Sequence, residues 1–290
     1  MTAQAAGAVP ALAVLGAGTM GHGIAQIAAM AGYDTRLFDA MPEALDTARE
    51  RIEANLRKGI QCGKVTSEER ERALDGLTYS RYLSEAAEGV GIAIEAVPEM
   101  LDLKQKVLTR CGEAAADGAL LATNTSSLSI TALAQGIPSP ERVIGMHFFN
   151  PAHIMALVEI VRGAETSDDS VARAREVAER MEKTPIVIAD SPGFASSRLG
   201  LALGLEAIRM VEDGVASPED IDTAMMLGYR HPMGPLKLGD LVGLDVRLDI
   251  ARYLHEALGS PVFEPPALLE RMVAAGRLGR KSGRGFYRWD

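Results

Sequence analysis

The chain has 290 residues, enough for one large domain or for two domains of ordinary size with substantial apolar cores. Hydrophobic residues make up 47% and charged residues 24%, which excludes an intrinsically disordered or low-complexity protein. The formal net charge of −9 argues against a general nucleic-acid binder, because binding the phosphate backbone needs a basic surface. An anionic ligand therefore needs local basic groups.

Two features of the sequence bear on the compartment. Cys62 and Cys111 are the only cysteines, too few for a disulfide framework or a cysteine-based zinc site, and they suit a reducing cytoplasm. The first 33 residues contain no Asp, Glu, Lys or Arg, but they lack the basic start of a signal peptide. Their apolar runs are shorter than the roughly 20 residues that cross a bilayer. We expect a cytoplasmic protein that binds neither a metal ion nor a membrane.

The chain begins with the pattern of a nucleotide-binding fold. Residues 11–15 form an apolar run that predicts a strand, a glycine-rich turn follows, and residues 23–32 predict a helix of small side chains. A second strand is predicted over residues 35–38 and ends at Asp39. Apolar residues at helical spacing between 45 and 56 predict an amphipathic surface helix.

Five further apolar runs predict strands, with helical patterns among the stretches between them. The predicted strands are residues 92–97, 119–122, 142–146, 157–161 and 186–188. The predicted helices are residues 99–111 and 168–183. Strands that alternate with helices are typical of a mostly parallel sheet covered on both faces.

The character of the chain changes after residues 191–193, Ser-Pro-Gly. Residues 194–213 are apolar on most faces, and Ser217 followed by proline and two acids is typical of a helix start. Further helices are predicted around residues 243–258 and 266–275, and no strand is expected before the last few residues.

These patterns predict an α/β chain of two domains. A Rossmann-type domain with a mostly parallel sheet is expected over residues 1–192, followed by an all-helical domain over residues 193–290. A helix as apolar as residues 194–213 must be covered by a domain core or by a dimer interface, so we expect the helical domain to serve dimerisation.

The glycines of the first turn have the spacing GxGxxG. Gly16, Gly18 and Gly21 follow a predicted strand, open a predicted helix and precede Asp39 at the end of the next strand, which is typical of a dinucleotide-binding turn. The backbone N–H groups at the start of the helix would bind the pyrophosphate. Asp39 would accept hydrogen bonds from ribose hydroxyls and repel a 2′-phosphate, which favours NAD over NADP. The alternative is a glycine turn with packing roles only.

Two polar clusters follow predicted strands further along the chain. Residues 124–127 (Asn-Thr-Ser-Ser) and 147–151 (His-Phe-Phe-Asn-Pro) should rim the crevice of the glycine turn, because ligands of open α/β sheets bind beyond the carboxyl ends of the strands. Glu159 lies in an apolar run and needs a partner. A histidine held by a buried carboxylate can take a hydroxyl proton while hydride leaves for nicotinamide, so His147 and Glu159 form a candidate pair. The alternative is a core histidine and an edge glutamate.

Most of the chain resembles the NAD-dependent 3-hydroxyacyl-CoA dehydrogenase family, and especially its bacterial 3-hydroxybutyryl-CoA dehydrogenases. The most specific motifs are NTSSLSIT at 124–131, RVIGMHFFNP at 142–151 and GRLGRKSGRGFY at 276–287. Further stretches that carry the resemblance are residues 16–26, 94–99, 157–163, 190–194 and 204–234. The resemblance implies NAD as cofactor, an acyl-CoA substrate, a place in fatty acid metabolism such as β-oxidation, and a homodimer.

The resemblance also implies a reaction and the residues that carry it. The reaction is reversible hydride transfer between (S)-3-hydroxyacyl-CoA and 3-oxoacyl-CoA, with 3-hydroxybutyryl-CoA as a short-chain example. His147 is implied as general base in oxidation and general acid in reduction, with Glu159 to orient it. Ser126 is implied to hydrogen-bond the 3-oxygen of the substrate, and both Ser126 and Asn150 approach the nicotinamide.

Further residues are implied to bind the cofactor. Glu99 and Lys104 match family positions that contact NAD. The complete set expected to bind NAD is Gly16, Gly18, Thr19, Met20, Gly21, Asp39, Glu99, Lys104 and Asn150.

The substrate side contains one departure from the family. Ser197 stands where the family usually has an asparagine that helps to hold the substrate near the base, so the identity of the substrate is less firmly implied than the cofactor. Lys58, near the end of the amphipathic helix, is a candidate partner for the CoA phosphates, although a solvated charged face is the alternative. His153 stands where the family often has an apolar residue, and we expect a solvated loop histidine there.

Two other functions are alternatives to this one. A related β-hydroxyacid dehydrogenase acting on a free hydroxy acid would use a lysine in the helical region, but residues 194–213 contain none. A non-catalytic NAD-binding homologue is supported only by Ser197.

Overall fold

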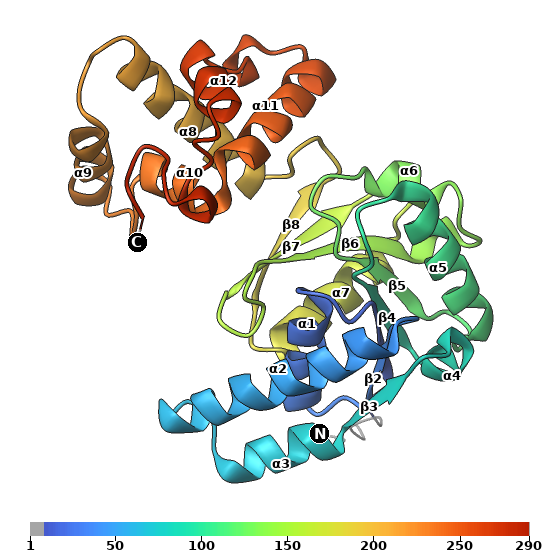
Figure 1. The fold of residues 1–290 in the computed structure, drawn as a ribbon. Helices are drawn as coiled ribbons and strands as arrows, with labels where there is room; N and C mark the ends of the chain where they lie inside the picture. Colours follow the sequence, from blue (N-terminus) through green and yellow to red (C-terminus); the bar gives the residue numbers. More distant parts are fainter. Residues whose placement is uncertain (1–8, 290) are drawn as a thin grey trace, which may run out of the picture. The chain divides into compact units, whose positions relative to one another are not determined.

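The structure is a computed structural model and describes residues 9–289. The chain divides between Ser191 and Pro192 into two compact units. The first unit holds a mostly parallel sheet with helices, and the second unit holds helices (Figure 1), which confirms the predicted fold class.

One sheet of eight strands forms the centre of the first unit. The strands are β1 (Leu12–Leu15), β2 (Thr35–Phe38), β3 (Leu77–Ser80), β4 (Ile92–Glu95), β5 (Leu120–Thr123), β6 (Val143–Phe148), β7 (Leu157–Arg162) and β8 (Thr184–Ala189). Their order is β3-β2-β1-β4-β5-β6-β7-β8, and every neighbouring pair is parallel except β6 and β7. Because the chain crosses from β3 at one edge to β4 beside β1, a crevice is expected beyond the carboxyl ends of β1 and β4.

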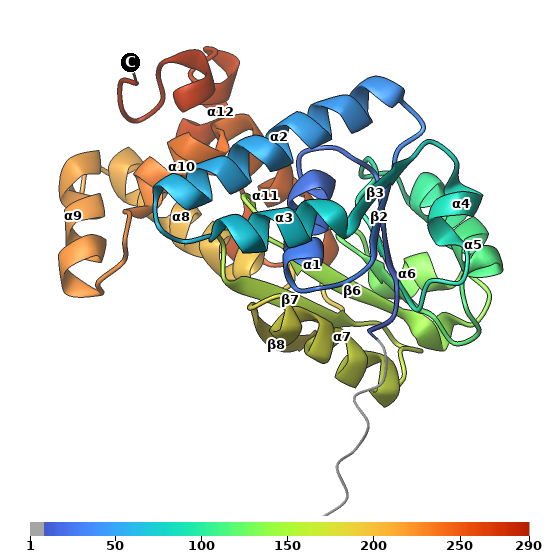
Figure 2. The same cartoon turned by 90° about the horizontal axis from the view of Figure 1, so that it is seen from below.

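Helices cover both faces of this sheet. They are α1 (Gly21–Met30), α2 (Pro42–Gln61), α3 (Ser67–Asp75), α4 (Leu83–Ala87), α5 (Leu101–Ala114), α6 (Ile130–Ala134), α7 (Asp168–Arg180) and the short 3-10 helix η1 (Pro140–Arg142). Alternate strand side chains such as Val14, Ile94 and Met146 share one core with α1, α2 and α7. The other face packs against α4, α5 and α6 (Figures 1 and 2).

The pairing of β6 with β7 sets the position of two candidate catalytic residues. The antiparallel register places His147 directly opposite Glu159, and Met146 opposite Ile160. Residues directly opposite one another in an antiparallel pair have adjacent side chains on the same face of the sheet. The sheet itself therefore brings the histidine and the glutamate together.

Five elements of the first unit were not predicted. They are α3, β3 and α4, which lie between residues 67 and 87, and the short helices α6 and η1. The edge strand β3 has the sequence LTYS and is partly exposed, so it lacks the apolar run of a central strand. A capping box between Thr66 and Glu69 starts α3, and this signal was present in the sequence.

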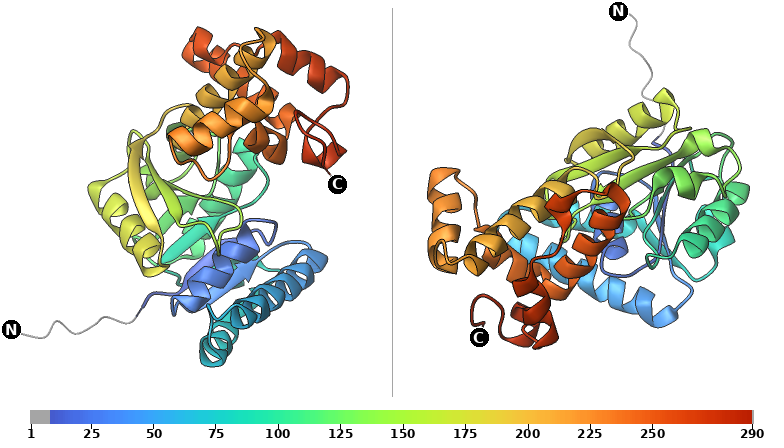
Figure 3. Two further views of the ribbon diagram at one scale, coloured as in Figure 1. Left: turned by 90° about the vertical axis from the view of Figure 1, so that its left-hand side faces the viewer. Right: turned by 90° about the horizontal axis from the view of Figure 1, so that it is seen from above.

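The second unit is built from helices in its described part, residues 192–289. They are α8 (Ser196–Glu212), α9 (Pro218–Gly228), α10 (Pro235–Val242), α11 (Leu244–Leu258), α12 (Ala267–Ala274) and the 3-10 helices η2 (Pro261–Phe263) and η3 (Arg280–Ser282). In place of strands, isolated bridges pair Arg284 with Gly279 and with Arg288. The orange and red ribbon of Figure 3 shows this bundle.

Buried aspartates hold the C-terminal segment of the second unit against the helices. Asp240 is fully buried and accepts hydrogen bonds from the backbone N–H groups of Phe286 and Tyr287, both at 2.9 Å, and from Nε1 of Trp289. A side chain on Gly285 would overlap the Asp240 carboxylate. The predicted motif at 276–287 therefore has a structural role.

No helix within residues 9–289 is both long enough and apolar enough to span a membrane.

Candidate active site

The glycine turn after β1 allows very close backbone packing. Gly16 has φ of +109°, and a Cβ atom there would lie 2.8 Å from the carbonyl group of Ala96 after β4. A Cβ atom on Gly21 would lie 1.7 Å from the carbonyl oxygen of Gly16. A Cβ atom on Gly18 would meet no atom within 4 Å, so the backbone there is open to a ligand. Each glycine has the surroundings that a dinucleotide-binding turn requires.

The start of α1 offers groups that suit an anion. No side chain caps this helix end, and its first turn has no acidic residue. The unpaired N–H groups and the positive end of the helix dipole are therefore available to a pyrophosphate. His22, in the first turn, has its Nδ1 atom 2.8 Å from the carbonyl oxygen of Gly18. The residues present fit the pyrophosphate of NAD.

Asp39 at the end of β2 supports the glycine turn from the side. Its Oδ2 accepts a hydrogen bond from the N–H of Ala17 at 2.8 Å, and its Oδ1 accepts one from the N–H of Met41 at 3.0 Å. Each carboxylate oxygen can accept a further bond. Asp39 can therefore hold the turn and receive ribose hydroxyls at once, and its contact with the turn was not foreseen from the sequence.

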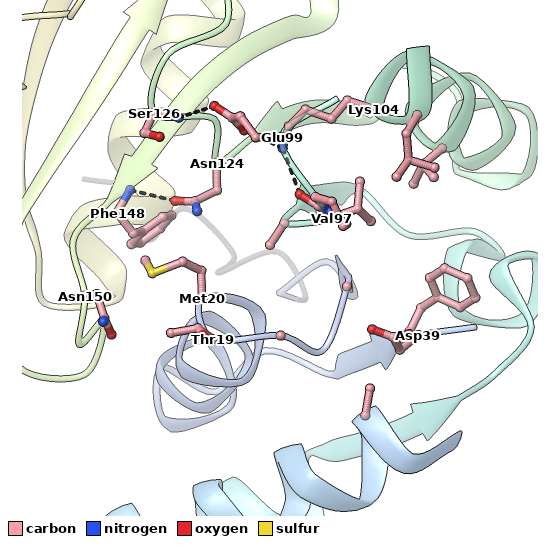
Figure 4. A pocket seen from close by; sticks show the side chains of 18 of the residues that line it. Thr19, Met20, Asp39, Val97, Glu99, Lys104, Asn124, Ser126, Phe148 and Asn150 are labelled. Atoms are coloured by element: carbon pink, nitrogen blue, oxygen red, sulfur yellow. Dashed lines mark hydrogen bonds and ion pairs between the residues drawn. The ribbon is translucent and has the colours of Figure 1, made fainter. Parts of the chain in front are cut away.

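A cavity of about 870 Å³ lies beyond the carboxyl ends of the strands. The predicted site residues that line it are Gly16, Gly18, Thr19, Met20, Asp39, Glu99, Lys104, Ser126, His147 and Asn150. Asp39 and Asn150 lie at opposite ends of the view in Figure 4. The cavity is large enough for an extended dinucleotide.

His147 and Glu159 form a buried pair beside this cavity. Nδ1 of His147 lies 2.8 Å from Oε2 of Glu159, and Glu159 is completely buried while His147 is nearly so. The ring of Phe149 packs against the histidine ring at a centroid distance of 4.5 Å. The histidine lines the cavity and the glutamate lies behind it, which is the arrangement needed for an oriented acid/base.

Glu99 holds the loop that carries Ser126. Its Oε1 accepts hydrogen bonds from the N–H groups of Ser126 and Ser127, at 3.0 and 3.1 Å, and from the hydroxyl of Thr125. Asn124 fixes the other side of the loop, because its Oδ1 accepts a hydrogen bond from the N–H of Phe148 at 2.8 Å (Figure 4). The loop after β5 is thus tied to both walls of the cavity.

Burial and hydrogen bonding act in opposite directions on Glu99. Burial favours the neutral acid, but hydrogen bonds from Thr125, Ser126 and Ser127 and the charge of Lys104 outweigh it. The pKa of Glu99 is therefore lowered from its ordinary value.

Lys104 lines the cavity but binds a residue that sequence reasoning missed. Its ammonium group hydrogen-bonds both carboxylate oxygens of Glu95, at 2.8 and 3.1 Å, and lies 3.2 Å from Oε2 of Glu99. Glu95 is the last residue of β4 and is fully buried. An acidic residue ending an otherwise apolar strand was the signal that could have identified it.

Four predicted residues are not among those that line this cavity, and one of them, Gly21, packs against Gly16 within the turn. Glu159 contacts the cavity through His147, and Lys58 is exposed near the end of α2. Ser197 lies in the second unit, in the first turn of α8, and is half-buried.

His153 differs from its prediction as a solvated loop residue. It is half-buried, its Nδ1 atom has no hydrogen-bond partner among the described residues, and its pKa is lowered. The main cause is burial, followed by the charges of His22, Lys183 and Lys58. The loop between β6 and β7 folds back among basic groups from other elements, which the sequence pattern did not indicate.

Across residues 9–289, no three His, Cys, Asp or Glu side chains are placed so as to hold a metal ion together.

Comparisons with known proteins cover almost the whole chain. Residues 11–191 match the NAD binding domain of 3-hydroxyacyl-CoA dehydrogenase, and residues 193–289 match the C-terminal domain of the same family. A probable 3-hydroxybutyryl-CoA dehydrogenase of Bacillus subtilis is 44% identical over 96% of each chain. A 3-hydroxyadipyl-CoA dehydrogenase of Escherichia coli is 41% identical over 97% of this chain, which spans 59% of that longer protein.

A solved structure agrees with these relatives. The structure of (S)-3-hydroxybutyryl-CoA dehydrogenase from Ralstonia eutropha matches with a TM-score of 0.93 and 38% identity, over 98% of this chain and 100% of that one. These findings confirm the predicted family, the NAD cofactor and the class of enzyme. The chain belongs to the 3-hydroxyacyl-CoA dehydrogenase family.

Proposed function

We propose that the protein interconverts (S)-3-hydroxyacyl-CoA and 3-oxoacyl-CoA thioesters of short chain, such as 3-hydroxybutyryl-CoA, with NAD. The observation that carries the proposal is the buried His147–Glu159 pair, whose histidine opens onto a cavity built around the glycine turn. Relatives named for 3-hydroxybutyryl-CoA and for 3-hydroxyadipyl-CoA have similar identity to this chain, so the choice of a short acyl chain belongs to the proposal.

The cofactor would lie along the cavity with its two ends held differently. Asp39 would bind the ribose of the adenosine half, Gly18, Thr19, Met20 and the start of α1 the pyrophosphate, and Asn150 the nicotinamide half. When bound, NAD supplies the hydride acceptor of the reaction.

His147 would take the proton of the substrate hydroxyl during oxidation and return it during reduction. A carboxylate oxygen can only accept, so the proton in the His147–Glu159 bond belongs to Nδ1 of the histidine. Nε2 is then the nitrogen that accepts the hydroxyl proton. Glu159 stabilises the imidazolium that forms, and Ser126 would hydrogen-bond the 3-oxygen of the substrate.

Two further residues are proposed to contact the substrate: Lys58 in the first unit and Ser197 in the second unit. The charge of Lys58 acts on His153 together with the charges of His22 and Lys183, so basic groups from several elements gather in one region. This supports Lys58 as a partner of the CoA phosphates on an acidic protein. Ser197, in place of the asparagine that the family usually has, would contact the acyl part of the substrate.

We also propose a homodimer in the cytoplasm. The second unit exposes apolar side chains on its helices, among them Leu199, Leu227 and Tyr229, and a partner subunit would cover them. The proposal of the cytoplasm rests on the small number of cysteines, Cys62 and Cys111, which suits a reducing compartment.

The test is a substrate panel with both cofactors. The purified protein is assayed with (S)-3-hydroxyacyl-CoA esters of increasing length and with the free hydroxy acids, by following the absorbance of the reduced cofactor. We expect turnover of the short-chain CoA esters with NAD and little with NADP. Turnover of free acids alone would support a β-hydroxyacid dehydrogenase, and no turnover at all would support a non-catalytic homologue. Equal use of NADP would contradict the role of Asp39.

A further inference from the structure

Glu95 is a buried carboxylate with no place in the reaction as proposed. It ends β4 in the middle of the sheet, is fully buried and is not among the residues that line the cavity. Burying a carboxylate is costly unless its oxygens are paired and hydrogen-bonded. We propose that Glu95 is a positioning residue, which holds the Ser126 loop in place through Lys104 and Glu99.

The hydrogen bonds of Glu95 support this role. Its Oε1 accepts a hydrogen bond from the N–H of Val97 at 2.6 Å and one from the ammonium of Lys104 at 2.8 Å. Its Oε2 accepts from the hydroxyl of Thr123 at 2.7 Å and again from Lys104 at 3.1 Å. Glu95 thereby joins the ends of β4 and β5 and fixes the start of the segment that leads to Glu99.

Lys104 connects Glu95, at the end of a strand, to Glu99. Only 1% of its side chain is exposed, and its ammonium also donates to the carbonyl oxygen of Val97 at 3.1 Å. Its ion pair with Oε2 of Glu99 is 3.2 Å long. An ammonium has three donors, and here they face Glu95, Val97 and Glu99. A desolvated lysine therefore anchors one oxygen of a carboxylate that borders the cavity.

The other oxygen of Glu99 completes the path to the loop. Oε1 accepts the backbone N–H groups of Ser126 and Ser127 and the hydroxyl of Ser127 at 3.0 Å. Figure 4 shows Glu99 between Lys104 and Ser126. Without its anchor on Lys104, the Glu99 carboxylate is held through Oε1 only, so the acceptor of the two N–H groups is less firmly placed. The position of the Ser126 hydroxyl then depends more on the contacts of Asn124 and Thr125.

The charges of the three groups depend on one another. Burial raises the pKa of Glu95, and the charge of Lys104 opposes this rise. In turn the charge of Lys104 helps the hydrogen bonds of Thr125 to lower the pKa of Glu99. Removing the Glu95 charge would leave Lys104 as a buried cation that Glu99 alone must pair.

The inference rests on the proposed function of Ser126, and its test has one readout that needs no activity. In Glu95→Gln the neutral amide cannot accept hydrogen bonds through both terminal atoms. We expect the backbone amides of Ser126 and Ser127 to exchange hydrogen for deuterium about tenfold faster than in the parent protein. We also expect kcat at saturating NAD and substrate to fall by about tenfold, because the loop is displaced by a fraction of an ångström. The dissociation constant of NADH should change by less than about threefold, since the glycine turn and Asp39 are untouched.

The matched control is Thr166→Val. Thr166 is buried, donates to the carbonyl oxygen of Val143 at 2.6 Å, and lies at the far end of β6 from His147. It should lower thermal stability without changing exchange in the Ser126 loop or kcat. If Glu95→Gln does not fold, Thr123→Val, which removes the hydroxyl that donates to Oε2 of Glu95 and leaves the cavity lining intact, is measured in the same way.

The outcomes separate the inference from the proposed function. A parent protein that turns over no hydroxyacyl-CoA contradicts the proposed function, whatever Glu95 does. Unchanged exchange at Ser126 and Ser127 in the variant overturns the inference. Faster exchange with unchanged kcat overturns it as well, because the loop would then be held without a catalytic effect. Weakened NADH binding with kcat retained at saturation would make Glu95 a support of the cofactor pocket and overturn its role toward Ser126.

Discussion

The imidazole of His147 illustrates how neighbouring residues decide the chemistry of one side chain. A histidine among aromatic residues is often a core residue, and the sequence alone left both interpretations open. The completely buried carboxylate of Glu159, 2.8 Å from Nδ1, now accounts for the orientation of the ring. Because Glu159 is buried and does not line the cavity, it can accept a hydrogen bond from the ring but cannot contact a ligand in the cavity. The catalytic roles of both residues stay predictions.

The first prediction concerns this pair. We expect His147→Ala to lower kcat by about 100-fold or more, because the general base is lost while the walls that bind NAD remain. The measurement is steady-state kinetics with a short-chain hydroxyacyl-CoA, with NADH binding followed by fluorescence.

Glu159→Gln is the companion variant. It retains a hydrogen-bonding group beside Nδ1 and should reduce kcat less than His147→Ala does. An enzyme that is indifferent to His147→Ala would refute the assignment of the base.

At the scale of secondary structure, the C-terminal segment is held by an aspartate from α10. Asp240 accepts hydrogen bonds from two backbone N–H groups and from the indole N–H of Trp289, all at 2.9 Å. A carboxylate can accept all three, whereas an amide has only one oxygen. Gly279 and Gly285 let the segment approach this side chain and its backbone, because a Cβ on either would overlap Asp240. The motif 276–287 is therefore explained by packing.

The second prediction follows from this contact. We expect Asp240→Asn to lower the free energy of unfolding of the second unit by about 2–4 kcal/mol, because buried donors lose a charged acceptor. Thermal unfolding followed by circular dichroism and limited proteolysis measure the effect. Asp249→Asn, on an exposed position of α11, serves as the control and should leave stability unchanged. Equal midpoints for Asp240→Asn and the parent protein would show that the segment contributes little.

Some elements could be predicted from the sequence and others could not. The central strands were visible because each is a buried apolar run, and α2 and α7 were visible from the helical spacing of their apolar residues. The edge strand β3 and the short helix α4 bury little, so local hydrophobicity did not reveal them. The helix α10 over residues 235–242 was also missed, because Pro235 and Gly239 have low helix propensity. The strand direction of β7 could not be read from its composition.

Over the molecule as a whole, a net charge of −9 coexists with a local group of basic side chains. His153, in the loop after β6, feels the charges of His22 from α1, Lys58 from α2 and Lys183, the residue before β8. Burial lowers the pKa of His22, His153 and Lys183, and the neighbouring positive charges lower that of His153 further. The folded protein therefore resists protonation in this region.

The third prediction is the resulting pH dependence of stability. When folding lowers the pKa of a base, the unfolded chain binds more protons than the folded protein at any pH between the folded-state pKa and the unfolded-state pKa. Within that window the free energy of unfolding therefore rises with pH. Stability should thus fall as the pH drops below about 6.5, the ordinary value for histidine, until the folded-state pKa is passed. His153→Asn should flatten this fall, changing the midpoint of thermal unfolding by about 1–3 °C across the window.

The control for the pH prediction lies in the second unit. His231→Asn changes a histidine remote in sequence from the basic group and should reproduce the pH profile of the parent protein. If His153→Asn also reproduces that profile, burial and charge at His153 do not contribute to stability.

The sequence by itself determined the family, the cofactor and the fold class. These depend on local signals: glycines at fixed spacing after a strand, an acid at the end of the next strand, and motifs of neighbouring residues. Such signals can be read because the residues that cooperate are close together in the chain. The candidate general base, His147, and the glycine turn were located in this way, and both border the cavity.

Only the tertiary structure decided which distant side chains meet. The antiparallel register of β6 and β7 places His147 opposite Glu159, and a shift of one residue would have moved the glutamate to the other face. The contact of Glu95 with Lys104 joins a strand to a helix, and His153 lies near basic groups from three other parts of the chain. Such pairings arise from the packing of the whole sheet and its helices, a long-range property that no local pattern encodes.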